Sequence, residues 1–137
     1  MTLYEQLGGQ PTLKAILEDF YDRIFDDIMI GYLFQNQDKA RLVDREVEWT
    51  GKLLGADISY RGRSMREVHR DHRILKGHFE RRFRLLENTL ADHNVPVEVQ
   101  AVWLAHTRSL ERAVLGAAAE RSGCDTPTAD DHGAHNA

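Results

Sequence analysis

The strongest constraint on the fold is an apolar stripe with helical spacing near the N-terminus. Six apolar or aromatic side chains recur at intervals of three and four residues, which places them on one face of an amphipathic helix of about four turns. They are Leu13, Ile16, Leu17, Phe20, Tyr21 and Ile24. Gly8 and Gly9 separate this helix from a short opening segment, and Pro11 suits its first turn, where the missing N–H costs no hydrogen bond.

The rest of the chain continues the helical pattern. Further helices are expected at about residues 39–54, 64–72, 78–92 and 97–121. The third of these five helices should begin with a capping box formed by Ser64 and Glu67. The last should turn Val99, Val102, Leu110 and Val114 inward. Three prolines and ten glycines leave little turn chemistry for a many-stranded β protein, so the 137 residues predict an all-α fold in one domain.

Composition excludes several classes of protein. Hydrophobic residues make up 42% and charged residues 29%, the balance of an ordinary soluble domain. No stretch approaches the roughly 20 apolar residues of a membrane-spanning helix, and the N-terminus lacks the pattern of a signal peptide. We therefore expect a cytoplasmic protein without membrane insertion. The single Cys124 excludes an intramolecular disulfide and a cysteine-only zinc cage. Residues 122–137 contain no large apolar side chain and are expected to form a disordered tail behind a domain of residues 1–121.

The charge is unevenly distributed. The net charge of −4 does not indicate a nucleic-acid binder. Between Arg61 and Arg84, however, nine Lys or Arg residues stand against three acidic ones. Such a segment either holds an anionic ligand or partner, or is a solvated helix face.

Glu46 interrupts an otherwise apolar face. It belongs to the helical stripe Leu42, Glu46, Trp49 and Leu53. One interpretation is a residue at the border of that face, with its carboxylate in water, because carboxylates are almost never buried unpaired. The other is a carboxyl group aimed into a cavity, where it could act as an acid or a hydrogen-bond donor.

Tyr21 and His69 allow the same two kinds of interpretation. Tyr21 lies on the inward face of the first long helix and is either a core tyrosine or a hydrogen-bond donor over a ligand. His69 follows Met65 by one turn on a short helix, where it is either a structural histidine or a metal ligand. The spacing of the histidines, acids and cysteine matches no conventional zinc site.

Several motifs together resemble the truncated haemoglobins, the short two-over-two helical globins, and specifically group 1 of that family. The resemblance covers about residues 2–116 in collinear order. Its motifs are Leu3 to Gly9, Asp19 to Arg23, Leu33-Phe34, Tyr60-Arg61-Gly62 with Met65 and His69, His78-Phe79, and Asn94-Val95-Pro96. The pair Phe20-Tyr21 and the run from Tyr60 to His69 are the most specific of these.

The resemblance implies a two-over-two helical sandwich that encloses haem b and reversibly binds O₂, and also NO and CO. It assigns His69 as the proximal ligand of the haem iron and Tyr21 as the distal donor to bound O₂. Four further positions would contact the cofactor: Phe34 by stacking, Leu42 as the distal gate, Trp49 along the ligand path, and Arg45 near a propionate. Arg45 should point about 100° away from Glu46 around the helix and leave its charge unneutralised.

The sequence departs from the family at three places. Glu46 replaces the usual glutamine, so it would either stay protonated as a second donor or ionise and hold O₂ less firmly. The pair Gly55-Ala56 replaces a second glycine pair. Arg112 stands where some members carry a histidine linked to a haem vinyl group, and His106 comes six residues too early, so non-covalent haem is expected.

The sequence is also compatible with two other functions. One is a haem enzyme, either an NO dioxygenase or an enzyme of peroxidase-type oxidation in which Glu46 acts as the base on peroxide. NO dioxygenation would need a partner reductase, because the chain has no flavin or nicotinamide fingerprint. The other is a haem-free helical interaction module that docks through residues 61–84.

Overall fold

The computed structural model describes residues 1–64, 67 and 74–115. Its helices are α1 (Leu3–Leu7), α2 (Gly9–Asp26), the 3₁₀ helix η1 (Gly31–Phe34), α3 (Lys39–Leu53), α5 (Lys76–Asp92) and α6 (Val97–Ser109). Over these described ranges there is no strand. The predicted all-α fold is confirmed. Most of the helix expected at 64–72, including Met65 and His69, lies outside the described residues, as does the expected tail.

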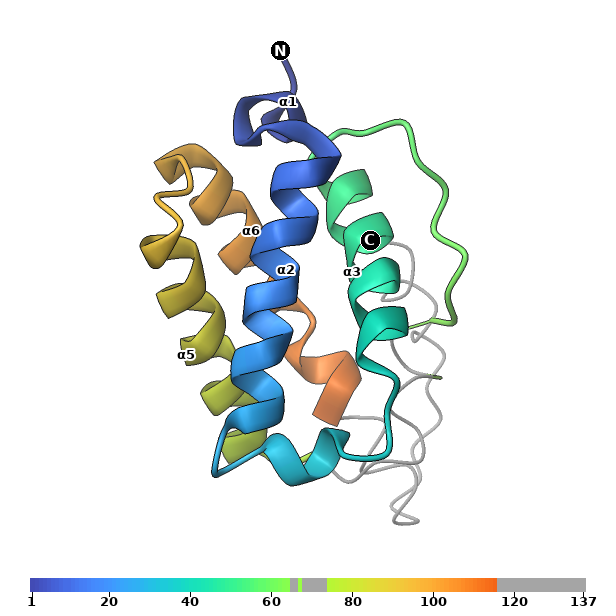
Figure 1. Cartoon of the computed structure of the whole chain (residues 1–137), viewed down its shortest axis with the longest axis vertical. Coiled ribbons are helices and arrows are strands. Elements are labelled where there is room, and N and C mark those ends of the chain that lie inside the picture. Colours follow the sequence, from blue (N-terminus) through green and yellow to red (C-terminus); the bar gives the residue numbers. More distant parts are fainter. Residues whose placement is uncertain (65–66, 68–73, 116–137) are drawn as a thin grey trace.

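The helices surround α2. In Figure 1, α2 runs along the front of the molecule, with α5 on one side, α3 on the other and α6 behind. The six side chains of the predicted stripe on α2 are all buried, with no more than 4% of any of them exposed. These side chains form the centre of the core, against which the other helices pack.

Gly8 and Gly9 allow the sharp junction between α1 and α2. Both have positive φ, 122° and 76°, a region that side-chain-bearing residues rarely adopt. A Cβ atom at Gly8 would also lie 2.4 Å from the Thr12 Oγ1. The helix α2 begins at Gly9, two residues before the predicted Pro11, which still falls in the first turn.

The α6 helix corrects two expectations. Val102 is 37% exposed, whereas Val99 and Trp103 are buried at 0% and 2%. The prediction for Val102 is wrong because Trp103, four residues after Val99, occupies the inward row. The helix also does not run unbroken from Val97, since it ends at Ser109 and a turn at Leu110 precedes a second helical stretch over residues 111–115.

A buried ion pair fixes α5 against the end of α2. The Asp27 carboxylate is 4% exposed and accepts hydrogen bonds from the backbone N–H groups of Met29 and Ile30. It also accepts two from Arg81, at 2.9 Å from Nε and 2.7 Å from Nη2. The Arg81 hydrogen bonds hold the pKa of Asp27 below its usual value. The next side chain, Arg82, points about 100° away from Arg81 around α5.

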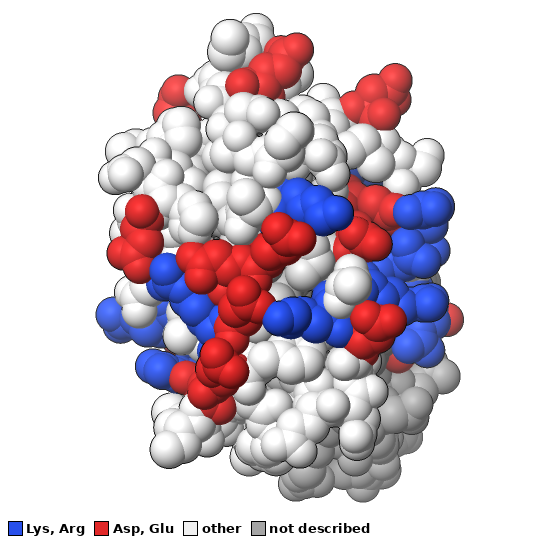
Figure 2. All heavy atoms as spheres, viewed as in Figure 1, with Lys and Arg blue, Asp and Glu red and all other residues white. Residues whose placement is uncertain are grey.

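The surface charges are segregated. Figure 2 shows acidic side chains gathered over α2, where Glu18, Asp22 and Asp26 are exposed. Basic side chains gather at the edge formed by α3 and the segment after it, which carry the exposed Arg41 and Arg61. The molecule thus has a basic edge despite its negative net charge.

Candidate functional site

A cavity of about 360 Å³ opens between α3, α5, α6 and the segment that follows α3. Its volume is within the range of pockets that hold cofactors and small ligands. The sequence-predicted residues Tyr21, Phe34, Leu42, Arg45, Glu46 and Trp49 all line it. His69 lies outside the described residues, so its position relative to the cavity is untested.

Helix α3 contributes two different faces. Val43 and Val47 are 3% and 7% exposed and pack into the core. The predicted stripe Leu42, Glu46, Trp49 and Leu53 instead faces the cavity. The sequence pattern therefore identified the pocket face of α3, and Glu46 is a carboxyl group directed into a cavity rather than out to the surrounding water.

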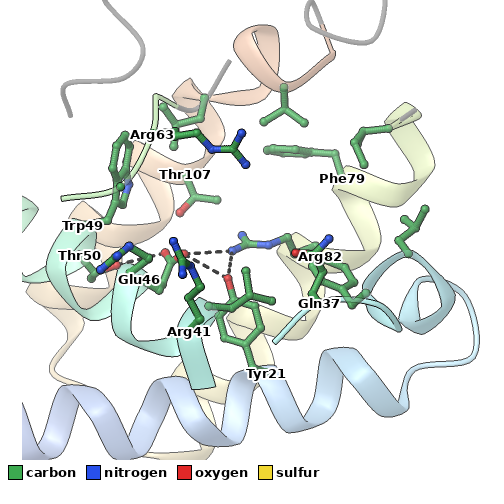
Figure 3. A pocket seen from close by; sticks show the side chains of 18 of the residues that line it. Tyr21, Gln37, Arg41, Glu46, Trp49, Thr50, Arg63, Phe79, Arg82 and Thr107 are labelled. Atoms are coloured by element: carbon green, nitrogen blue, oxygen red, sulfur yellow. Dashed lines mark hydrogen bonds and ion pairs between the residues drawn. The ribbon is translucent and has the colours of Figure 1, made fainter. Parts of the chain in front are cut away.

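Glu46 forms two hydrogen bonds and one ion pair. The Tyr21 hydroxyl donates to Glu46 Oε1 at 3.2 Å, and the Thr50 hydroxyl donates to Oε2 at 3.3 Å. Arg82 Nη2 forms an ion pair with Oε1 at 3.7 Å and donates to the Tyr21 oxygen at 3.5 Å. Figure 3 shows these side chains converging on one another in the pocket. The network therefore ties residues of α2, α3 and α5 together around the Glu46 carboxyl group.

Tyr21 keeps its proton in this environment. Its side chain is 4% exposed, and its ring packs edge-on against Phe20 at a centroid distance of 5.3 Å. Burial, with a further contribution from the nearby Glu46, raises the pKa of the Tyr21 phenol. The phenol is therefore a neutral hydrogen-bond donor at any physiological pH.

Arg82 is the site residue that sequence reasoning missed. It was grouped with the basic residues of segment 61–84 as either a docking surface or a solvated face. A signal was nevertheless present, because Arg82 lies three residues after the buried Phe79 and four before the buried Leu86. At those spacings it shares the inward stripe of α5.

The buried carboxylate of Glu48 links α3 to the segment that follows it at the edge of the pocket. It is 8% exposed and accepts hydrogen bonds from the Arg61 backbone N–H at 3.0 Å and from the Arg61 guanidinium. Arg45 Nη1 lies 3.5 Å from the same carboxylate, so Arg45 pairs with Glu48 and not with Glu46. Although burial raises the pKa of Glu48, the Arg61 hydrogen bonds hold it below its usual value.

Tyr60 and Gly62 shape the segment over the cavity. The Tyr60 ring packs edge-on against Trp49 at 5.0 Å, and its hydroxyl donates to the Arg63 carbonyl at 2.9 Å. A Cβ atom at Gly62 would lie 2.2 Å from the Tyr60 hydroxyl oxygen, so a larger residue there would displace the Tyr60 side chain. The segment places Arg61 and Arg63 in the pocket lining.

His106 presents an unsatisfied polar atom to the site. It lines the cavity, its ring lies 6.1 Å from that of Trp49, and its buried Nε2 has no hydrogen-bond partner among the described residues. Burial lowers the pKa of His106, which favours the neutral imidazole. Buried polar atoms are normally hydrogen-bonded, so this nitrogen is available for contact with a molecule bound in the cavity.

The lining as a whole suits a mainly apolar molecule that carries acidic groups. Aromatic and aliphatic side chains form its walls, including Phe34, Leu42, Trp49, Phe79 and Trp103. Arg41, Arg45, Arg61 and Arg63 line it as well. Figure 3 shows Arg41 and Arg63 directed into the pocket, and neither has a carboxylate partner within residues 1–64, 67 and 74–115.

Comparison with known proteins agrees with this geometry. The bacterial-like globin family matches residues 2–115. A group 1 truncated haemoglobin from Synechocystis is 31% identical over 104 residues, which cover 73% of this chain and 84% of that protein.

Two solved structures have the same arrangement of helices. The 2/2 haemoglobin of Synechococcus, with covalently attached haem, matches with a TM-score of 0.79 and 26% identity over 85% of this chain and 99% of its own. The truncated haemoglobin of Tetrahymena pyriformis in the Fe(III) form matches with a TM-score of 0.73 and 27% identity over 84% and 97%.

The helical sandwich and its pocket define a globin. The chain belongs to the bacterial-like globin family, as a group 1 truncated haemoglobin. The expected two-over-two fold is thereby confirmed. Globins use haem to bind O₂ and other diatomic gases, and this general function applies to the chain. Within the described residues, no helix has the length and apolar character needed to cross a membrane.

Proposed function

We propose that the pocket holds haem b without a covalent bond and that His69 is the protein ligand of its iron. The bound cofactor supplies the metal at which a diatomic gas binds. Phe34 would stack on its apolar face, Leu42 and Trp49 would line the path of the gas, and Arg45, which pairs with Glu48, would lie near a propionate. The apolar walls and basic edge of the cavity support this assignment, because they match the two chemical halves of haem.

Tyr21 is proposed as a donor to the bound gas. Its phenol is buried, neutral and part of the pocket lining, which is the observation that carries the proposal. A hydrogen bond to an electron-rich ligand atom is charge-assisted and contributes about 1.5–3 kcal/mol. Glu46 competes for the same proton, because the Tyr21 hydroxyl already donates to its carboxylate. Glu46 therefore moderates the affinity for gas.

Absorption spectra of the purified protein test the proposal. We expect a Soret band in the ferric state, a distinct ferrous spectrum, and a further change when O₂ is added. Extraction with acid and an organic solvent should remove all of the haem, because Arg112 replaces the histidine that carries a covalent link in some relatives. A protein that takes up no added haem would refute the function, whereas haem that resists extraction would refute only the non-covalent attachment.

Peroxidase-type oxidation is a second candidate, favoured by the Glu46–Arg82 ion pair. Glu46 would accept a proton from hydrogen peroxide, and the guanidinium beside it would stabilise the negative charge that forms on the peroxide. A Glu46→Gln variant should lower peroxide turnover at least about tenfold and alter its pH profile, since general-base catalysis typically contributes a hundredfold or more. Unchanged turnover between pH 5 and 8 would remove Glu46 from the mechanism. NO dioxygenation stays a third possibility that depends on a separate reductase.

A further inference from the structure

Arg82 differs from the arginines beside it on α5. Arg81 turns to the buried Asp27, and Arg84 is 68% exposed and pairs with Glu87 at 3.4 Å. The Arg82 side chain is 27% exposed and lines the cavity, with its Cζ 5.0 Å from the centre of the Phe20 ring. Figure 3 shows its guanidinium directed into the pocket towards Glu46 and Tyr21.

The Arg82 guanidinium carries more N–H donors than it uses among the described residues. Arginine carries five N–H groups in a planar fork. A single nitrogen, Nη2, makes both contacts, to the Tyr21 oxygen at 3.5 Å and to Glu46 at 3.7 Å. Among the described residues, Nε and Nη1 of Arg82 have no hydrogen-bond partner. The N–H groups on these two nitrogens are therefore uncommitted.

The polar side chains next to Arg82 in the pocket are already hydrogen-bonded to one another. The single proton of Tyr21 is directed at Glu46, and so is the proton of Thr50. A ligand that enters the pocket must compete with the carboxylate for either proton. In addition, the negative charge of Glu46 repels an anion unless a cation nearby offsets it. Arg82 supplies both the uncommitted donors and the offsetting charge.

We propose that Arg82 is a ligand-binding residue of this pocket, which donates to the electron-rich atom of the ligand and enables the site to accept small anions despite Glu46. The proposal rests on the haem-based function proposed above. Under this proposal, α5 contributes a hydrogen-bond donor in addition to Tyr21 of α2. The balance between the positive charge of Arg82 and the negative charge of Glu46 then determines which ligands bind. Small anions and gases with a polarised outer atom are the ligand class that this balance favours.

Ligand affinities of the haem-loaded protein test the proposal, with azide as the anionic probe in the ferric state and CO as the neutral probe in the ferrous state. Arg82→Met should weaken azide binding at least about tenfold, the size of one hydrogen bond between charged groups, and change CO affinity less than about threefold. Glu46→Gln should strengthen azide binding. Arg84→Met is the matched control, since Arg84 is exposed on the same helix, and it should leave both affinities unchanged.

An Arg82→Lys variant separates charge from hydrogen-bond geometry. Lysine keeps the positive charge but lacks the planar fork, so azide affinity should fall between those of the parent and of Arg82→Met. The C–O stretching frequency of the CO complex, which responds to positive charge near the ligand, should shift in the same order. If Arg82→Met takes up no haem, the Arg82→Lys variant tests whether Arg82 binds the ligand. A loss of at least about threefold in azide affinity in that variant would support the role of Arg82.

Azide affinity that is unchanged in these Arg82 variants, with intact haem spectra, would overturn the role of Arg82 and leave the proposed gas binding in place. Failure of the parent protein to take up haem would instead refute the proposed function itself.

Discussion

Replacement of His69 by alanine is expected to abolish the ferrous–O₂ spectrum and most haem retention. The resemblance assigns His69 as the single protein ligand of the iron, so the variant loses the bond that fixes the metal in the pocket. Absorption spectra after reduction and exposure to O₂ measure the effect. Added imidazole should restore part of the ferrous spectrum in a His69→Gly variant, because the free ring can enter the space that the side chain leaves.

Substitution of other histidines shows whether the effect is specific to His69. His78 and His106 line the cavity, and the Nε2 of His106 is buried without a partner among the described residues. His93, which lies 2.7 Å from Asp19 outside the cavity, is the control, and His93→Ala should retain a normal spectrum. If His69→Ala keeps its O₂ spectrum while His78→Ala or His106→Ala loses it, the proximal assignment is wrong.

Tyr21→Phe is expected to accelerate O₂ dissociation about tenfold. The substitution removes one hydroxyl group but keeps the buried ring and its packing against Phe20, so the fold should persist. The loss corresponds to one hydrogen bond to a partially charged ligand. Stopped-flow displacement of O₂ by CO measures the rate.

Tyr60→Phe is the matched control for this variant. The Tyr60 hydroxyl donates to the Arg63 carbonyl and belongs to the segment over the pocket, not to the network around Glu46. Its removal should leave the dissociation rate of O₂ within about twofold of the parent. An equally small effect for Tyr21→Phe would show that Tyr21 does not donate to O₂ and would leave Arg82 as the principal donor.

Much of the fold follows from local pattern. The stripe on α2 is predictable because residues three and four apart share a helix face, and burial of that face is the main source of stability. The capping box of Ser64 and Glu67 is also local, and both of its hydrogen bonds are present at 3.0 Å. Val102 was misassigned because its helix offers several apolar residues around its circumference, and packing decides which row turns inward.

The candidate site is only partly predictable. Tyr21 and Glu46 stand out because each places a polar group on an apolar face, and the structure brings them together across 25 positions of sequence. The buried Glu48 gave no such signal, because its partner Arg61 lies 13 residues further along, beyond the end of α3.

The amino-acid sequence alone determined the all-α fold, the apolar stripe of α2 and the pocket-facing row of α3, since each depends on residues within a few turns of one another. The tertiary structure decided which cation meets Glu46. Three arginines, Arg81, Arg82 and Arg84, lie within one turn of α5, each rotated to a different direction. Arg81 pairs with Asp27, Arg82 enters the pocket and Arg84 faces solvent. The spacing of Arg82 from Phe79 and Leu86 places it on the inward stripe of α5, but its contact with Glu46 of α3 depends on how the helices pack, and no local pattern encodes that contact.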